Sequence, residues 1–242
     1  MRLPGRQDEL IADVAAANPR TIVVIHAGAP IEMPWAQQVP AILWAYYPGQ
    51  EGGHALADVL TGTASPSGKL PMSIPLRLED DPTFINYPGD QSILYGEGIF
   101  IGYRNYDYRK MEVRFPFGHG LSYTSFEYSA LRCPECFHPG EKVEISFSLL
   151  NRGERQGAEV AQVYVRDVHA SVQRPIRELK GFSRIILDPG EETIVTIQLD
   201  ERAFSFYDQD KGCWTMEPGY FEIEVGSSSR DIRLKGSLRL EA

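Results

Sequence analysis

Residues 41–62, AILWAYYPGQEGGHALADVLTG, combine a strand, a tight turn and a helix in one stretch. The run from Ala41 to Tyr47 is continuously apolar, which is typical of a strand covered on both faces. After the turn, a helix is predicted to carry apolar residues on one side and to stop at Gly62, because glycine favours helix ends. This order of elements predicts a layered α/β unit.

The sequence before and after this stretch continues the α/β pattern. Thr21 to Gly28, TIVVIHAG, is a second β-branched strand candidate, and residues 69–75, KLPMSIP, are a third and weaker one. A helix is predicted over Gln7 to Asn18. Its apolar face would carry Leu10, Ile11 and Val14. We therefore expect an α/β sandwich with flavodoxin-like layers, and we expect it to be incomplete because the chain opens inside a loop that leads to a helix.

The second half, from about Ser122, reads as short β segments separated by the turns HPGEK, RGERQG and DPGEE. In VEISFSL and TIVTIQL every second residue is apolar, so each strand buries one face. The predicted segments are Val143–Leu150, Val160–Arg166, Leu179–Leu187, Thr193–Leu199 and Tyr220–Val225. About a hundred residues of such strands predict a β-sandwich of fibronectin type III style.

These patterns divide the chain into three parts. Residues 1–85 form the α/β part, residues 86–122 connect, and residues 123–242 form the β-sandwich. The connecting part is dense in glycine, tyrosine and phenylalanine. Because it is too aromatic for a flexible linker, we expect it to pack along the surface of another domain.

Composition narrows the classes of function. The formal charge of −9 argues against nucleic acid as a partner, because binding to phosphates is driven largely by lysine and arginine. No apolar run is long enough to span a membrane, and the first residues do not form a signal peptide. Three cysteines, with no glycosylation sequon, favour the cytoplasm. A signal peptide preceding the printed sequence would instead make the protein secreted.

No motif in the sequence identifies an active site. The turn PGQEGG matches no phosphate-binding pattern, and Glu51 would occupy the place that an anion needs. The turn PGQEGG is therefore interpreted as a structural connection between the strand and the helix. His26 ends a predicted buried strand, where a lone histidine is more often a core residue than a catalyst. His119 lies between two glycines, which suggests a turn.

Several carboxylates lie near predicted turns. Two carboxyl groups at a suitable separation can hydrolyse a glycosidic bond. The candidates are Glu32, Glu51, Asp58 and Glu97. Sequence spacing alone does not pair them.

Longer blocks of sequence resemble a known family. They are GAPIEMPW (28–35), residues 41–75, PTFINYPGD (82–90), YGEGIFIGYRNYD (95–107) and FPFGHGLSYTSFEYS (115–129). In order and spacing, these blocks resemble the C-terminal half of glycoside hydrolase family 3 β-glucosidases. PIRELKGFSRIILDPGEE and EPGYFEIEVGSSS resemble the fibronectin type III-like domain that closes many members.

The resemblance implies a retaining β-glucosidase that acts on β-glucosides or oligosaccharides without a metal or organic cofactor. Family members have a barrel that carries an aspartate nucleophile, and an α/β sandwich that supplies a glutamate acid/base. Neither residue can be placed on this sequence, so no catalytic residue is assigned. The opening MRLPGRQDELI resembles an internal family segment that follows the acid/base loop. We therefore expect a fragment that lacks the barrel and is inactive alone.

The same resemblance suggests where such a barrel would contact this chain. Gln50, Glu51 and Glu97 are candidate contacts between the α/β part and the barrel. The alternative is a free-standing, non-catalytic module that binds a carbohydrate or a protein through the aromatic region from Asn86 to Tyr123. A start in the middle of a domain favours the fragment over the module.

Overall fold

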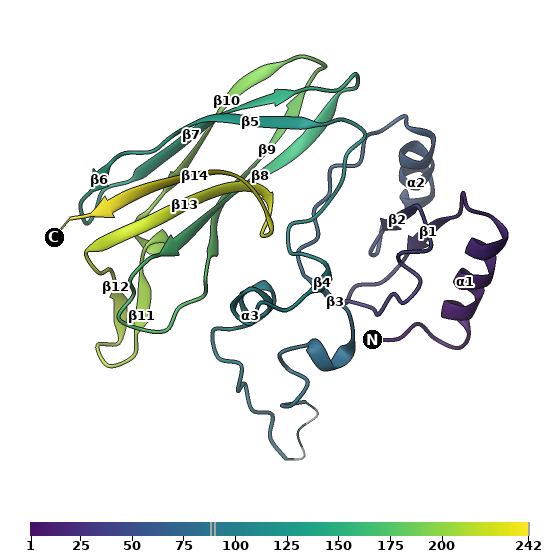
Figure 1. Ribbon diagram of the computed structural model, residues 1–242, viewed down its shortest axis with the longest axis horizontal. Helices are drawn as coiled ribbons and strands as arrows, with labels where there is room; N and C mark the ends of the chain where they lie inside the picture. The colour runs from purple at the N-terminus through teal and green to yellow at the C-terminus, as the bar shows by residue number, and fades with distance from the viewer. Residues whose placement is uncertain (88, 90, 242) are drawn as a thin grey trace.

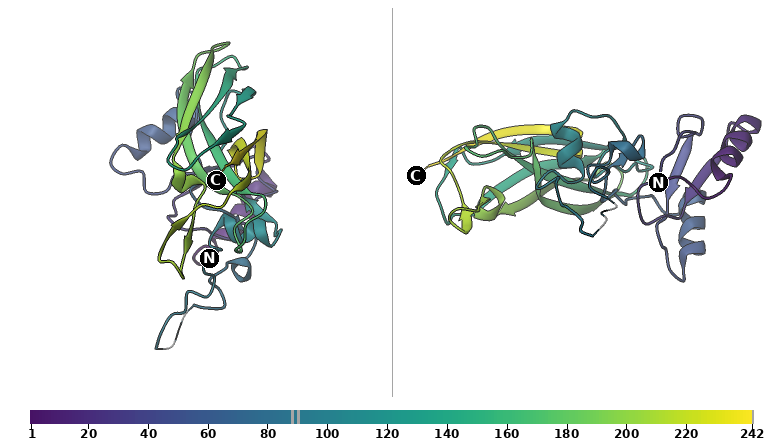
Figure 2. Two further views of the ribbon diagram at one scale, coloured as in Figure 1. Left: turned by 90° about the vertical axis from the view of Figure 1, so that its left-hand side faces the viewer. Right: turned by 90° about the horizontal axis from the view of Figure 1, so that it is seen from below.

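The structure, a computed structural model, describes residues 1–87, 89 and 91–241 (Figure 1). It consists of a small α/β unit at one end and a β-sandwich at the other, with the two arranged along the long axis (Figure 2). The first part contains α1 (Gln7–Ala17), β1 (Ile22–Ile25), β2 (Ala41–Trp44), α2 (Gly52–Thr61), β3 (Ile74–Pro75), η1 (Leu78–Asp80), α3 (Tyr103–Tyr108) and β4 (Val113–Phe115). Among the described residues, no helix is long and apolar enough to cross a membrane.

The α/β unit contains the predicted strand-turn-helix. Strand β1 pairs with β2 in parallel, from Ile22 opposite Ala41 to Ile25 opposite Trp44. Helix α2 ends at Gly62, which adopts the left-handed conformation with φ of 79°, as predicted from the sequence. The parallel order of two strands and the position of α2 confirm the α/β class.

The third predicted strand is shorter than expected. Only Ile74–Pro75 forms a strand, and it pairs antiparallel with β4. The preceding residues follow another course because Leu70 exchanges backbone hydrogen bonds with the turn at residues 118–119. Its N–H donates to the carbonyl of His119 at 2.8 Å, and its carbonyl accepts from Gly118 at 2.8 Å. Leu70 is therefore paired with the C-terminal end of the connecting part, residues 86–122.

Burial in the α/β unit is lower than the sequence pattern predicts. Leu10 and Val14 on α1 are 62% and 44% exposed, and Ile22 on β1 is exposed. The expectation that both strands are covered on both faces is wrong for this structure. In the part of the chain that the structure describes, the sheet of this unit has only the strands β1 and β2, so it offers too little surface to bury the apolar faces of both helices. The buried side chains gather instead around Trp35, whose indole N–H donates to Asp8 at 2.8 Å.

The second part is the predicted β-sandwich. One sheet has the strand order β10-β7-β5 and the other has the order β6-β14-β13-β8-β9. Its elements are β5 (Phe126–Arg132), β6 (Cys136–Phe137), β7 (Val143–Asn151), β8 (Gly157–Asp167), β9 (Glu178–Leu187), β10 (Glu192–Leu199), η2 (Glu201–Ala203), β11 (Phe206–Asp208), β12 (Cys213–Thr215), β13 (Gly219–Ser228) and β14 (Asp231–Leu240). All five predicted β segments lie within strands.

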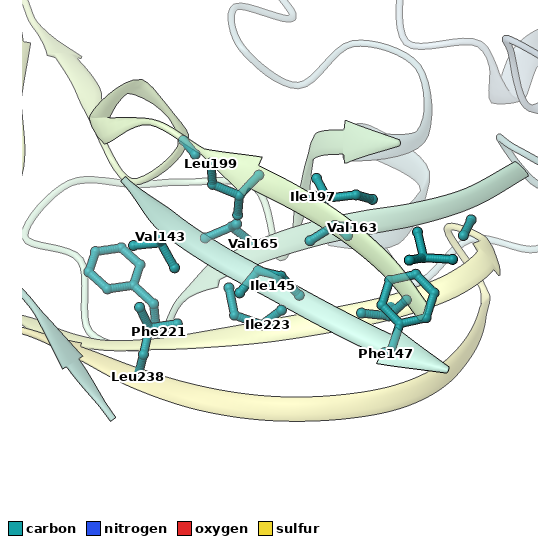
Figure 3. Packing of buried hydrophobic residues seen from close by; sticks show 14 of the residues in the cluster. Val143, Ile145, Phe147, Val163, Val165, Ile197, Leu199, Phe221, Ile223 and Leu238 are labelled. Atoms are coloured by element: carbon teal, nitrogen blue, oxygen red, sulfur yellow. The ribbon is translucent and has the colours of Figure 1, made fainter. Parts of the chain in front are cut away.

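The core of the sandwich lies between the two sheets. Figure 3 shows Ile145 and Phe147 of β7 facing Val163 of β8 and Ile223 of β13. Each of these side chains is at most 1% exposed. Burial of this many aliphatic and aromatic side chains is the main stabilising contribution to the sandwich, at about 1.5–3 kcal/mol for each large side chain.

Residues 102–118 cover part of the outer face of the five-stranded sheet, at β8 and the start of β9. Tyr103 stacks on Phe117 at 4.6 Å between ring centroids and meets Tyr164 of β8 edge-on at 6.1 Å. The phenol oxygen of Tyr103 accepts a hydrogen bond from the N–H of Leu179 at 2.8 Å. The expectation that the connecting part packs along another domain is confirmed for these residues. Pro88 and Asp90 of the PTFINYPGD block, and Ala242 at the end, lie outside the described residues.

Candidate functional site

Three of the four candidate carboxylates have local partners in the structure. Glu32 accepts a hydrogen bond from the N–H of Leu78 at 2.8 Å and lies 3.4 Å from Arg2. Glu51 lies 2.8 Å from the Nδ1 atom of His54 on the exposed start of α2. Glu97 accepts from the side-chain amide of Asn86 at 3.1 Å. These contacts hold turns and loops, so their geometry describes a scaffold.

The fourth candidate, Asp58, lies exposed on α2. The three candidate barrel contacts fall into two groups. Gln50 and Glu51 are neighbours at the exposed start of α2, whereas Glu97 is half-buried within the long loop before α3. The structure thus brings Gln50 and Glu51 together and attaches Glu97 to a different element.

The long loop presents a large apolar surface. We call it the loop surface and define it as the exposed apolar side chains of residues 76–101. They are Leu76, Leu78, Phe84, Ile85, Tyr87, Ile93, Leu94, Tyr95, Ile99 and Ile101. Ile85 and Tyr95 are the most exposed, at 89% and 81%. An exposed apolar surface of this kind is characteristic of an interaction site.

The loop is fixed at both ends. At its start, the backbone of Leu78 is held by Glu32, and the guanidinium of Arg77 donates to the buried carboxylate of Asp80 at 2.8 Å. At its end it continues into α3, which lies on the sandwich. Within the loop, the amide of Asn86 reaches across to Glu97. The apolar side chains are therefore presented on a frame that the rest of the chain holds.

A charged network fastens α3 to the sandwich. Arg104 of α3 lies 3.1 Å from Glu178 of β9, which also contacts Arg174 and Lys180. Burial acts to raise the pKa of Glu178, but Lys180 and Arg104 outweigh it and hold that pKa below its ordinary value. The carboxylate stays ionised and ties α3 to the sheet.

The two histidines singled out from sequence have different surroundings. His26 lies just beyond the end of β1 and is exposed, so the interpretation as a core residue is wrong. Strand β1 stops one residue earlier than that interpretation requires. His119 stacks on Phe115 with ring centroids 5.2 Å apart. Burial, and to a lesser degree Lys69, lowers the pKa of His119.

Tyr46 is a feature that sequence reasoning missed. It follows β2 with a φ of 50°, which is uncommon for a residue other than glycine and often occurs at functional sites. Its phenol oxygen is buried without a hydrogen-bond partner among the described residues, and burial raises its pKa. It lies at the carboxyl end of a parallel strand, where α/β sheets bind ligands. No local sequence pattern signals a positive φ at a tyrosine.

Comparison with known families divides the chain in the same order as the fold. Residues 1–123 match the model of the glycosyl hydrolase family 3 C-terminal domain. Residues 159–229 match the model of the fibronectin type III-like domain. The first match covers the α/β unit, the loop surface and residues 102–118.

Several named proteins are similar over all or nearly all of the chain. Thermostable beta-glucosidase B of Acetivibrio thermocellus is 46% identical over 100% of this chain and 32% of its own length. The solved beta-glucosidase of Kluyveromyces marxianus in complex with glucose has a TM-score of 0.95 at 41% identity, over 100% of this chain and 29% of that one. Beta-glucosidase 3B of Thermotoga neapolitana in complex with glucose has a TM-score of 0.92 at 37% identity, over 98% and 34%. The chain thus spans about a third of the length of these relatives.

Proposed function

The chain belongs to glycosyl hydrolase family 3, and we propose that it works as the C-terminal, structural part of a retaining β-glucosidase. The observation that supports this most directly is the similarity of the whole chain to about a third of several proteins named as β-glucosidases. Under this proposal, the hydrolysis of terminal β-glucosyl groups belongs to the larger assembly.

The chemistry of a retaining glycosidase explains why this part is not sufficient. One carboxylate attacks the anomeric carbon and a second, close by, protonates the leaving oxygen. In this chain Glu32, Glu51 and Glu97 have structural partners, which suits scaffolding rather than this reaction. We propose that both catalytic carboxylates lie outside the 242 residues.

We further propose that an N-terminal barrel domain covers the loop surface. Its exposed apolar side chains, Ile85 and Tyr95 above all, would be buried by such a partner. Gln50, Glu51 and Glu97 would provide polar contacts around it. The frame formed by Glu32 and α3 would hold this surface in place before the partner binds, which lowers the entropy lost on docking.

The structure makes the alternative of a free-standing binding module less favourable. It places a binding surface on the aromatic region from Asn86 to Tyr123. Residues 102–118 of that region are already packed on the sandwich, as the contacts of Tyr103 and Phe117 show. Among the described residues of that region, most of the exposed apolar side chains belong to the loop surface, and its apolar character fits a permanent protein contact better than a sugar.

A hybrid enzyme tests the proposal. The chain would replace the matching part of the Kluyveromyces marxianus relative, and hydrolysis of an aryl β-glucoside would be measured for the hybrid and for the chain alone. We expect activity from the hybrid only. Activity of the chain alone, after removal of host enzymes, would overturn the proposal. A hybrid that melts cooperatively but is inactive would also contradict it.

A matched pair of substitutions tests the docking surface in the same hybrid. Ile85→Asp, on the loop surface, should reduce the amount of active, folded hybrid. Ile194→Asp changes an isoleucine that is 69% exposed on β10, and it should have little effect. Equal behaviour of the two variants would show that the barrel does not cover the loop surface.

A further inference from the structure

The hairpin of β11 and β12 carries an exposed aromatic surface for which the proposed function gives no role. Tyr207 on β11 and Trp214 on β12 are opposite each other in the strand register. Their rings meet edge to face, with centroids 5.7 Å apart, and their exposed fractions are 51% and 46%. Aromatic residues presented side by side in this way are characteristic of binding surfaces.

Trp214 differs from the two other tryptophans of the chain. The indole N–H of Trp35 donates to Asp8 and that of Trp44 donates to the carbonyl of Ala27, each at 2.8 Å. Within the described part of the chain, no acceptor is found for the indole N–H of Trp214 or for the phenol O–H of Tyr207. Both rings therefore keep a polar atom for an external partner.

One charged side chain contacts the aromatic pair, and the hairpin turn beside it is held by an ion pair. The guanidinium carbon of Arg202 lies 3.8 Å from the centre of the Trp214 ring. In the turn of the hairpin, Asp208 and Lys211 form an ion pair at 2.9 Å. Asp208 also accepts hydrogen bonds from the N–H groups of Asp210 and Lys211, each at 3.1 Å, so its carboxylate is held in place.

This combination selects among classes of ligand. Arg202 already occupies the cation position at the Trp214 ring, which disfavours a cationic ligand. The net charge of −9 on the chain disfavours an anion. A neutral ring with an apolar C–H face and hydroxyl groups fits, because the face packs on an aromatic ring of the pair and the hydroxyls bond to the guanidinium of Arg202. Sugars in the pyranose form have this structure.

The hairpin lies at the end of the sandwich that is far from β1 and β2 (Figures 1 and 2). We propose that Tyr207 and Trp214, with Arg202, form a binding site for a β-linked gluco-oligosaccharide. The choice of glucose units rests on the proposed function, whereas the sugar class rests on the residues themselves. The site would hold a long substrate on the enzyme by a second point of contact, which raises its effective concentration.

Tryptophan fluorescence and calorimetry test this site on the 242-residue chain. Trp35 is buried and Trp44 is partly buried, so cellopentaose bound at the hairpin should change the emission of Trp214. By calorimetry, Trp214→Ala should bind about tenfold more weakly or worse, as expected for loss of an aromatic anchor. Trp214→Phe should keep part of the affinity. Phe182→Ala, which changes a 67% exposed aromatic residue on β9, should bind normally.

Four outcomes would overturn the proposal. They are no binding at millimolar sugar, binding that Trp214→Ala leaves unchanged, preference for xylo-oligosaccharides over gluco-oligosaccharides, and self-association of the chain that Trp214→Ala abolishes. The last would assign the hairpin to a second copy of the protein. Because these measurements need no catalysis, their failure is distinguishable from inactivity of the hybrid enzyme.

Discussion

Arg230 and Asp107 are 123 residues apart in the sequence, yet Arg230 Nε donates to Asp107 Oδ1 at 2.8 Å. The same guanidinium donates through Nη2 to the carbonyl of Met111 at 2.7 Å. Burial raises the pKa of Asp107, while Arg230 acts in the opposite direction. One side chain from the turn between β13 and β14 therefore holds α3 and the residues that follow it against the sandwich.

Removing this guanidinium should destabilise the protein. In Arg230→Ala the Asp107 carboxylate, only 10% exposed, loses its partner. We expect a loss of about 2 kcal/mol in the free energy of unfolding, less than for a fully buried pair because Arg230 itself is 31% exposed. Urea denaturation measures it. Arg233→Ala is the control, since its pair with Asp231 is about half exposed and should cost about 0.5 kcal/mol or less. Equal losses of stability in the two variants would show that the Arg230–Asp107 pair contributes no more than an exposed ion pair.

A second buried pair joins the α/β side to the sandwich. Lys69 lies 2.7 Å from Glu159 of β8, and both side chains are nearly enclosed. Lys69→Met should cost about 3 kcal/mol because it leaves Glu159 without its charge partner. The double variant Lys69→Met/Glu159→Gln should recover part of this loss, as measured by thermal unfolding. No recovery would mean that Lys69 acts mainly through its hydrogen bond to the carbonyl of Gly120.

Gly118 is required by both its backbone conformation and its surroundings. It has a φ of 79°, and a methyl group there would collide with the side-chain amide of Gln162. Gly140 has a similar φ of 85° but open space around it. Gly140→Ala should therefore cost about 1 kcal/mol from the backbone alone, and Gly118→Ala clearly more, at about 3 kcal/mol. Chemical denaturation compares them, and equal costs would exclude a role for the contact with Gln162.

Acidification should weaken the fold through His119. Because its pKa is lowered in the folded state, the unfolded chain takes up the proton at a higher pH. The stabilising contribution is present above the ordinary histidine pKa of about 6.5 and is lost as the pH falls through the folded-state value. The free energy of unfolding should decrease between about pH 7 and pH 5, and His119→Gln should flatten that slope. His169→Gln, at an exposed position, should keep it; an unchanged slope in His119→Gln would refute the assignment.

The α/β unit and the sandwich should differ in stability. Strands β1 and β2 form a sheet of two strands, which is marginal alone, whereas the sandwich has two sheets and an extensive core. Hydrogen exchange should show weak protection for β1 and β2 and strong protection for β7, β8 and β13. One cooperative transition with well-protected amides across residues 7–75 would contradict this expectation.

Local features of this protein could be predicted from sequence with good accuracy. The end of α2 at Gly62 depends on a residue that tolerates a positive φ, and the strands β7 and β10 depend on alternation over seven or eight residues. Both signals are contained within a few neighbouring positions. The family resemblance, which rests on longer blocks in a fixed order, is confirmed by the matching family models.

The sequence alone determined the first two helices and strands of the α/β unit, five strands of the sandwich, and the family to which the chain belongs. Tertiary structure decided which surfaces meet: that residues 102–118 cover β8, that Arg230 reaches Asp107, and that Leu10 and His26 are exposed. It also brought Tyr207, Trp214 and Arg202 together. The physical reason is the sequence distance over which each effect acts. Conformational preference is set by adjacent residues. Burial and pairing depend on contacts between distant segments, which local patterns do not encode.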